Sequence, residues 1–243
     1  FAHMPIKKLP VFLVASAMSH AAGVFAWPVM AFGGTLVCVE RPEPLTILQA
    51  MHHHRVTYTF LPPTLIYMML AHPRACEFDF SAMDYFVYGG APMSADKVKQ
   101  AIKLFGPCMT QIYGQVECPC TIGILSPADH LEALSDPTKK GRLVSCGRPP
   151  VFVQVEMMDE NSDLVAQGEW GEIVVRGTFV SLGYYADEEA SEANRAHGWH
   201  HTGDIGYKDK DGFVYIVDRK KDMIITGGLN VFPIEIERLI WSH

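Results

Sequence analysis

The 243-residue sequence has no apolar run long and clean enough to cross a bilayer, which takes about 20 residues. It has no internal repeat and no low-complexity segment. Basic residues are scarce: 20 Lys and Arg against 27 Asp and Glu give a formal net charge of -7, which argues against nucleic acid or an acidic membrane as partner. The first residues also lack the layout of a signal peptide. These absences predict a cytoplasmic protein without a transmembrane segment.

The cysteines lack the paired spacing of a disulfide framework or a zinc site. The six stand at positions 38, 76, 108, 118, 120 and 146, and Cys118 and Cys120 are too close in sequence for an easy bridge. We therefore expect reduced thiols, with a zinc site as the alternative. The triple His52-His53-His54 resembles a metal clamp, but we predict that it ends a helix, where histidines suit the C-terminal dipole.

The first half of the chain alternates between strand-like and helix-like stretches. Hydrophobic residues make up 49% of the sequence and charged residues 19%, a globular composition. Apolar and β-branched runs predict strands at 10–17, 35–39, 56–61, 85–88 and 109–113. Helical spacing predicts helices at 24–32 and 44–51, then two more, one capped by Thr64 and ending near 71, the other capped by Ser94 and ending near 105. This alternation favours an α/β fold, a mostly parallel sheet with flanking helices.

The pattern changes after about residue 126. Residues 126–140 are polar and loop-like, and strands are predicted at 151–158, 171–176 and 213–217, with turns at 159–161 and 209–212. We predict a small antiparallel, barrel-like subdomain there. A charged break at 218–222 precedes a short strand at 223–226 and a helix that Pro233 opens. The predicted domains are 1–126, 127–218 of the same large domain, and 219–243, a hinge and the start of a truncated α+β C-terminal domain.

Several loops carry side chains suited to nucleotide chemistry. Between Gln111 and Gly123 the chain presents Tyr113, whose ring could stack on a base, and Glu117, whose carboxylate could hold magnesium. The turn Gly89-Gly90-Ala91-Pro92 follows a predicted strand, where open sheets bind ligands. Asp204 could accept hydrogen bonds from ribose hydroxyls, and Arg219 could meet a phosphate. Taken singly, each stretch is also explained by an ordinary turn or a solvated surface residue.

Taken together, these stretches form an ordered set of motifs. In sequence order they are Gly-Gly-Ala-Pro, Tyr-Gly-x-x-Glu, Gly-Glu-Ile-x-Val-Arg-Gly, Thr-Gly-Asp and Asp-Arg-x-Lys-Asp-x-Ile-x-x-Gly-Gly. This order resembles the acyl-adenylate-forming superfamily, which includes acyl- and aryl-CoA ligases, luciferases and adenylation domains of peptide synthetases. The resemblance covers roughly residues 10 to 240.

The resemblance implies a role for each matched residue. The adenine side of an ATP site would be lined by Gly89, Gly90, Ala91 and Pro92. The adenylate would be held by Gln111, Tyr113 and Gly114, the magnesium by Glu117, and the ribose and phosphate by Asp204 and Arg219. Lys221 falls at the hinge, Gly227 and Gly228 would line the tunnel for the pantetheine arm of coenzyme A, and His20 would border the acyl pocket. Glu117 and Lys221 are thus the expected catalytic positions.

The activity implied by the resemblance is that of an acid–CoA ligase. ATP, Mg²⁺ and coenzyme A are the expected cofactors, and a carboxylic acid is the expected substrate. An adenylation domain that loads a carrier protein and a non-catalytic nucleotide- or acyl-binding relative remain the alternatives. No carboxylate stands near residues 16–19 to hold a substrate ammonium, and the apolar Val24, Phe25, Trp27 and Phe86 favour a fatty or aromatic acid, unless these side chains are simply core.

The sequence departs from the family pattern in three places. Val116 stands where the family usually has Thr, and the loss of that hydroxyl donor would cost about 1 to 3 kcal/mol of phosphate binding. The phosphate loop expected before residue 10 and the catalytic Lys expected beyond His243 lie outside the sequence, and the last helix is cut in its middle. We therefore expect a piece of a longer protein that alone adenylates slowly or not at all.

Overall fold

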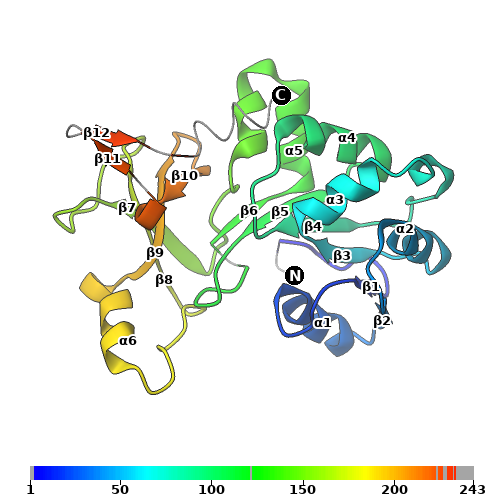
Figure 1. Ribbon diagram of the computed structural model, residues 1–243, viewed down its shortest axis with the longest axis horizontal. Coiled ribbons are helices and arrows are strands. Elements are labelled where there is room, and N and C mark those ends of the chain that lie inside the picture. Colours follow the sequence, from blue (N-terminus) through cyan, green and yellow to red (C-terminus); the bar gives the residue numbers. More distant parts are fainter. Residues whose placement is uncertain (1–2, 121, 223, 227–228, 232, 234–243) are drawn as a thin grey trace. The chain divides into compact units, whose positions relative to one another are not determined.

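The computed structural model describes residues 3–120, 122–222, 224–226, 229–231 and 233. The chain divides into two compact units, and Figure 1 labels their helices and strands. Unit 1 consists of Phe1–Tyr113 and Ile124–Gly147, and unit 2 of Gly114–Gly123 and Arg148–His243. The ten residues Gly114–Gly123 thus leave unit 1 and belong to unit 2. The predicted domain boundaries at 126 and 218 stay a prediction.

Unit 1 is built around sheet A, whose strands lie in the order β2-β1-β3-β4-β5-β6. The strands are β1 (Val11–Val14), β2 (Thr35–Cys38), β3 (Tyr58–Leu61), β4 (Tyr85–Gly89), β5 (Met109–Tyr113) and β6 (Gly123–Leu125). The pairs β1–β2, β1–β3, β3–β4 and β4–β5 are parallel. Every residue of β3, β4 and β5 is buried, as expected for a parallel sheet that is covered on both faces.

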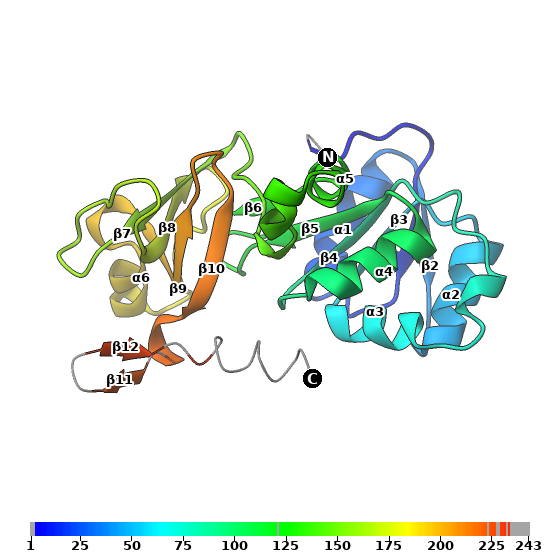
Figure 2. The same ribbon diagram turned by 90° about the horizontal axis from the view of Figure 1, so that it is seen from above.

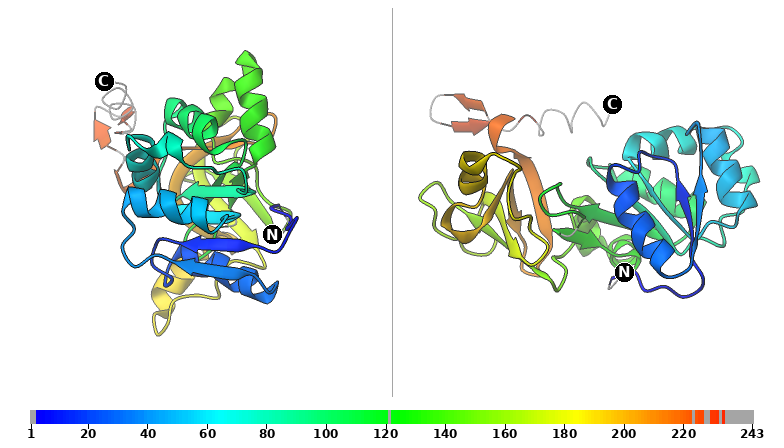
Figure 3. Two further views of the ribbon diagram at one scale, coloured as in Figure 1. Left: turned by 90° about the vertical axis from the view of Figure 1, so that its right-hand side faces the viewer. Right: turned by 90° about the horizontal axis from the view of Figure 1, so that it is seen from below.

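Helices cover both faces of sheet A (Figures 2 and 3). They are α1 (Ala21–Ala31), α2 (Pro44–His53), α3 (Pro63–Leu70), α4 (Ala95–Phe105) and α5 (Pro127–Ser135). The chain steps outward from β1 to β2 and then back past β1 to β3. Because parallel crossovers are right-handed, this reversal places α1 on one face and α2, α3 and α4 on the other. The large core contains Phe86 and Met109 from the sheet and Ile47, Ile66 and Val98 from these helices.

The helix ends test three sequence predictions. Ser94 caps α4, since its Oγ accepts a hydrogen bond from the Lys97 N–H at 3.4 Å, as predicted. His52 and His53 lie in the last turn of α2, which confirms that this histidine run ends a helix. The prediction for Thr64 was wrong: α3 begins at Pro63, with Pro62 at the N-cap. A proline suits the first turn because the N–H that it lacks has no partner there.

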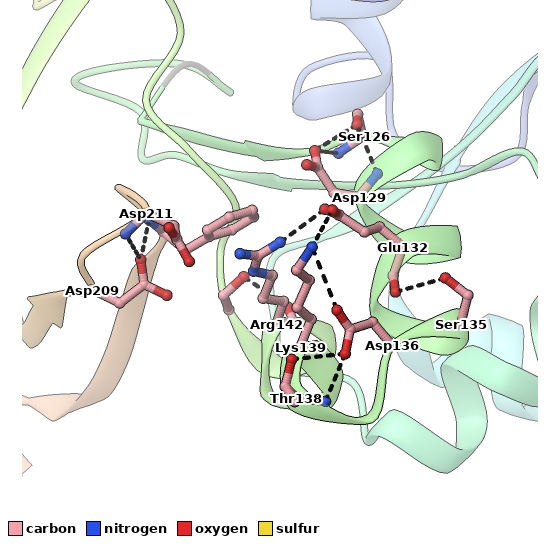
Figure 4. Close-up of polar contacts among 12 residues, drawn as sticks. Ser126, Asp129, Glu132, Ser135, Asp136, Thr138, Lys139, Arg142, Asp209 and Asp211 are labelled. Atoms are coloured by element: carbon pink, nitrogen blue, oxygen red, sulfur yellow. Dashed lines mark hydrogen bonds and ion pairs between the residues drawn. The ribbon is translucent and has the colours of Figure 1, made fainter.

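The prediction of a loop at 126–140 was also wrong, because this segment folds as α5 followed by a 3₁₀ segment, Pro137–Val144. Ser126 and Asp129 form a capping box at the start of α5 (Figure 4). At the other end, Glu132 pairs with Arg142 at 2.8 Å and also with Lys139. Capping and ion pairs therefore stabilise a helix that carries too few apolar residues to be recognised from its hydrophobic pattern.

Unit 2 is built around sheet B, which is antiparallel in the order β10-β9-β8-β7. Its elements are β7 (Val153–Met158), β8 (Gly171–Gly177), α6 (Glu188–Asn194), β9 (His200–Lys208) and β10 (Val214–Arg219). Three of the four strands were predicted, but β9 was missed. The stretch Thr202-Gly203-Asp204, for which the sequence left an ordinary turn open, lies within β9. The predicted turn at 209–212 is confirmed: the Asp209 carboxylate accepts the Asp211 and Phe213 N–H groups, each at 2.9 Å (Figure 4).

Two short antiparallel strands follow, β11 (Ile224–Thr226) and β12 (Leu229–Val231). The first confirms the strand predicted at 223–226 over its described residues. Gly227, Gly228 and the helix predicted after Pro233 lie outside the described residues. The predicted fold class is confirmed in its two main parts, a mostly parallel sheet with flanking helices and a separate antiparallel sheet. Within the described chain, no helix combines the length and apolar character needed to span a membrane.

Candidate functional site

In unit 1, the predicted site residues lie at the carboxyl ends of neighbouring strands. Gly89 ends β4, and Gln111 and Tyr113 lie in β5, whose register sets Gly89 opposite Ile112. A Cβ atom at Gly89 would lie 2.5 Å from the Ile112 carbonyl oxygen, and Gly90 has φ of 80°, so this turn requires glycine. Gly90, Ala91 and Pro92 are exposed, whereas Gln111 and Tyr113 are buried. The structure thus places the carboxyl ends of β4 and β5 side by side in sheet A, at the edge where open α/β sheets bind ligands.

His20 follows β1 and occupies the N-cap position of α1. Its side chain is exposed, and its Nδ1 lies 2.9 Å from the Ser19 hydroxyl. The apolar residues that suggested an acyl pocket divide into two kinds. Phe25 and Phe86 are buried core residues, with Phe25 stacked on Phe60.

In α1, by contrast, Val24 and Trp27 are exposed, by 42% and 71%. Val24 and Trp27 therefore present apolar surface to solvent, whereas Phe25 and Phe86 do not.

In unit 2, Asp204 and Arg219, which were both expected near a ribose and phosphate, pair with each other. They are register partners in β9 and β10, and Arg219 Nε lies 2.9 Å from Asp204 Oδ1. The Asp204 side chain is buried and the Arg219 side chain half exposed. Gln115 adds a third member, since its Nε2 donates to Asp204 Oδ2 at 3.0 Å and to the Thr202 carbonyl at 2.7 Å. These bonds attach the Tyr-Gly-x-x-Glu loop to the Thr-Gly-Asp strand.

Glu117, the predicted magnesium ligand, is held by a loop that precedes α6. The Tyr184 hydroxyl donates to Glu117 Oε1 at 2.7 Å, and the Ser181 N–H donates to the Glu117 carbonyl at 2.7 Å. Burial disfavours the charge of Glu117, but the Tyr184 hydrogen bond and the nearby His200 and Arg219 outweigh it, so the pKa of Glu117 is lowered. The same bond raises the pKa of Tyr184. Glu117 is therefore an anion at neutral pH, as a cation ligand must be.

A second carboxylate, Glu172 of β8, organises the backbone beside Asp204. It accepts hydrogen bonds from the Gly203 N–H at 3.0 Å and from Lys220 Nζ at 2.9 Å, and it lies 3.1 Å from His201 Nδ1. Burial opposes ionisation of Glu172, but the bonds from Lys220 and His201 outweigh it and lower its pKa. Glu172 therefore fixes the Thr-Gly-Asp segment from the strand next to it.

Sequence reasoning missed the residues that support the site: Gln115, Glu172, Tyr184, His200 and Lys220. Gln115 and Glu172 stand inside the quoted motifs, so their positions were visible although their partners were not. His200 is buried, its Nε2 lies 3.2 Å from Gln115 Oε1, and burial lowers its pKa. Nothing in the sequence pairs Tyr184 with Glu117, 67 residues away.

The remaining predicted residues carry fewer contacts. Gly114 is exposed, the Val116 side chain is 88% exposed, and Lys221 is exposed in the 3₁₀ turn Lys220–Asp222. The roles predicted for Gly227 and Gly228 lie outside the described residues. None of the six cysteines, all within the described residues, forms a disulfide bond. Over the part of the chain that the structure describes, no group of three His, Cys, Asp or Glu side chains is arranged to hold a metal ion.

Comparison with known proteins decides what these motifs belong to. The family model described as AMP-binding enzyme matches residues 2–185, which is more than half of the chain. The chain belongs to the AMP-binding enzyme family. This agrees with the resemblance that the five ordered motifs carry.

Individual members of the AMP-binding enzyme family match almost the whole chain. Medium/long-chain-fatty-acid–CoA ligase FadD8 of Mycobacterium tuberculosis is 39% identical over 96% of this chain and 40% of its own length. The structure of amide bond synthetase McbA from Marinactinospora thermotolerans matches with a TM-score of 0.90 and 32% identity, over 100% of this chain and 48% of that one. The structure of O-succinylbenzoate coenzyme A synthetase of Bacillus subtilis, in complex with ATP and magnesium, matches with a TM-score of 0.86 and 28% identity. That match covers 100% of this chain and 48% of that one. The chain therefore spans less than half of each protein.

Proposed function

We propose that the protein containing this chain activates a carboxylic acid as an acyl-adenylate and transfers the acyl group to coenzyme A. The observation that carries the proposal is the cluster in unit 2, where Gln115, Asp204 and Arg219 are joined by bonds of 3.0 and 2.9 Å. A buried carboxylate paired with a half-exposed guanidinium offers an acceptor for ribose hydroxyls and a cation for phosphate. The fatty-acid–CoA ligase relative supports coenzyme A as acceptor and a fatty acid as one substrate class.

The reaction proceeds in two displacements. A carboxylate oxygen of the acid attacks the α-phosphorus of ATP, the acyl–phosphate bond forms and pyrophosphate leaves. The thiolate of coenzyme A then attacks the acyl carbon, the thioester forms and AMP leaves. The first step needs an anionic acid to approach anionic phosphates, so positioning and charge neutralisation dominate the barrier. Arg219 supplies positive charge, and Asp204 fixes the sugar that carries the phosphates.

The roles that the resemblance implies for the other matched residues are part of the proposal, unit by unit. From unit 1, the turn after β4 and the end of β5 would line the base and the adenylate, through residues Gly89, Gly90, Ala91, Pro92, Gln111 and Tyr113. From unit 2, Gly114 would adjoin the adenylate and Lys221 would act as the hinge. His20 would border the acyl group, and the exposed Val24 and Trp27 favour a fatty or aromatic acid.

Magnesium fits the residue set beside Glu117. This ion prefers oxygen ligands and is commonly bound by one or two carboxylates, with water and substrate phosphates completing the shell. Glu117 is partly exposed, and its pKa is lowered, so it offers the single carboxylate that such a site needs. When bound, the ion would neutralise charge on the phosphates. Tyr184 would meanwhile hold the carboxylate in place.

A substrate screen on the natural full-length protein tests the proposal. Fatty acids of graded length and hydroxycinnamic acids are offered with ATP, and acyl-adenylate is detected by mass spectrometry and by exchange of labelled pyrophosphate into ATP. We expect adenylate with at least one class. Absence of adenylate with every acid would overturn the proposal in favour of a non-catalytic binding protein. Coenzyme A, a carrier protein and an amine are then offered separately, and thioester formation with coenzyme A is the expected outcome.

A variant pair connects the activity to the cluster. Asp204→Asn removes the charge that would bind the ribose, and we expect the half-saturating ATP concentration to rise by about 10-fold or more. Asp163→Asn, an exposed aspartate of the same unit, should leave it unchanged. Equal ATP dependence of the two variants would exclude Asp204 from the nucleotide site.

A further inference from the structure

The loop between β8 and α6 contacts Glu117 at two points. The Ser181 N–H donates to its carbonyl oxygen and the Tyr184 hydroxyl to its carboxylate oxygen Oε1, both at 2.7 Å. One contact fixes the backbone of Glu117 and the other fixes the end of its side chain. A glutamate that is ordered in this way has lost its rotamer freedom before any ligand arrives.

Tyr184 is itself anchored through Ser191, a buried residue of α6. Ser191 Oγ accepts the Tyr184 N–H at 2.8 Å and donates to the Asp187 carbonyl at 2.6 Å. The neighbouring Gly183 has φ of 143°, and a Cβ atom there would lie 2.8 Å from Ser191 Oγ. The backbone of Tyr184 therefore lies close against α6, so α6 determines where the phenol hydroxyl points.

The two oxygens of Glu117 have different environments. Oε1 accepts the Tyr184 hydroxyl, whereas no other side chain among the described residues donates a hydrogen bond to Oε2. A hydroxyl that donates to a carboxylate forms a short, charge-assisted bond, which orients the carboxylate plane. The structure thus offers one oxygen that is held and a second that is available.

Building on the proposed function, we propose that Tyr184 is a positioning residue for the cation site: its hydroxyl holds Oε1 of Glu117 so that Oε2 binds the divalent cation that accompanies ATP. A group that hydrogen-bonds to a metal-ligating side chain and orients it commonly raises the metal affinity by 10- to 100-fold. Tyr184 neither touches the cation nor takes part in the chemistry, so its loss weakens cation binding without changing the reacting groups.

The adjacent residue provides a matched control. Tyr185 is fully exposed, whereas Tyr184 is 41% exposed and bonded to Glu117. Tyr184→Phe and Tyr185→Phe each remove one hydroxyl from neighbouring positions in the same loop, and both keep the ring. The readout is Mn²⁺ binding to the full-length protein in the presence of a non-hydrolysable ATP analogue, with free Mn²⁺ measured by electron paramagnetic resonance. We expect about 10-fold or weaker binding for Tyr184→Phe and no change for Tyr185→Phe.

A second measurement separates positioning from a merely structural role. If Tyr184 acts through the cation site, raising the Mg²⁺ concentration should return adenylate formation by Tyr184→Phe close to the wild-type rate. A general distortion of the loop would not be rescued by metal. Wild-type Mn²⁺ affinity in Tyr184→Phe, or a rate defect that Mg²⁺ does not restore, would overturn the inference.

Glu117→Gln separates this inference from the proposed function. If Glu117→Gln weakens Mn²⁺ binding and Tyr184→Phe does not, the metal role of Glu117 stands and the role of Tyr184 falls. If neither variant changes Mn²⁺ binding, the proposed cation site itself is wrong. In the double variant, we expect Tyr184→Phe to add nothing to the loss caused by Glu117→Gln, because the hydroxyl acts only through that carboxylate.

Discussion

In unit 1, the candidate residues stand at the ends of strands that are buried on both faces, and the apolar core fixes them. In unit 2, the candidate residues are fixed by polar side chains: Gln115 and Arg219 hold Asp204, and Tyr184 holds Glu117. Apolar packing is strong but carries little direction, whereas hydrogen bonds orient individual atoms. The contrast suits the proposed roles, because a flat base needs a shaped surface, while ribose, phosphate and cation need charges at defined points.

The comparison predicts that a core truncation in unit 1 has the largest effect on stability. Phe86 of β4 is fully buried, with its ring 4.7 Å from that of Phe105. Phe86→Ala should cost about 3 to 5 kcal/mol of unfolding free energy in unit 1. Hydrogen exchange of the β4 and β5 amides in the full-length protein measures this locally. Phe32→Ala, at a site 58% exposed, should cost under about 1 kcal/mol, and equal losses would contradict the role of the core.

The next effect depends on pH, through a histidine inside unit 1. His130 is buried beside the Tyr88 hydroxyl at 2.9 Å, and burial lowers its pKa from 6.5 to about 4. The unfolded chain therefore binds a proton between these values that the folded unit does not, so stability falls as pH drops below about 6.5.

By pH 5, protonation of His130 in the unfolded chain should lower the free energy of unfolding by about 2 kcal/mol. Urea unfolding of wild type and His130→Gln at pH 7 and pH 5 measures it, and the variant should lose that much less stability on acidification. His53→Gln, at an exposed site, should behave as wild type. Parallel pH profiles for all three proteins would refute the assignment.

A smaller effect is expected from the polar network of unit 2. Glu172→Gln keeps the shape of the side chain but removes the charge that Lys220, His201 and the Gly203 N–H share, and should cost about 1 to 2 kcal/mol. Glu156→Gln is the control, since the Glu156 side chain is 30% exposed against 9% for Glu172, and its 2.7 Å pair with Lys208 should contribute under about 1 kcal/mol. Exchange of the β8 and β9 amides reports both. A larger loss of stability in Glu156→Gln than in Glu172→Gln would contradict the organising role of Glu172.

The smallest effect on stability is expected at Val116, whose side chain is 88% exposed. Val116→Thr should change the unfolding free energy by less than about 0.5 kcal/mol. If the family hydroxyl contacts phosphate as the resemblance implies, the same change should lower the half-saturating ATP concentration several-fold, because one donor is worth about 1 kcal/mol. Val116→Ala is the control without a hydroxyl. Identical ATP dependence of the Thr and Ala variants would show that position 116 does not meet the phosphate.

The same contrast explains what the sequence could predict. The strand at 109–113 was predicted with its observed bounds, because every position of β5 is buried and its residues suit a strand. Strand β9 was missed because its inward positions include His200, Thr202 and Asp204, so hydrophobic alternation fails where polar groups are buried. Helix α5 was missed because a capping box and ion pairs stabilise it in place of an apolar stripe.

The candidate site divides in the same way. The ordered motifs predicted Glu117, Asp204 and Arg219 as site residues, because each motif is a short local sequence that can be recognised without the structure. The supports Gln115 and Tyr184 act on partners 89 and 67 residues away, and no local pattern encodes such a pairing. The family resemblance therefore supplied the residues that would touch ligand, and the structure supplied those that hold them.

Because the segment Gly114–Gly123 belongs to unit 2, some of its contacts can form only late in translation. Gln115 emerges from the ribosome 85 to 89 residues before His200, Thr202 and Asp204, its hydrogen-bond partners. Until β9 has been translated, Gln115 lacks these three partners, however early the parallel strands before it assemble. A nascent chain that stalls before residue 200 therefore holds a complete Tyr-Gly-x-x-Glu motif without these three anchors. If these residues bind nucleotide as proposed, the nascent chain would gain that binding only after β9 has been translated.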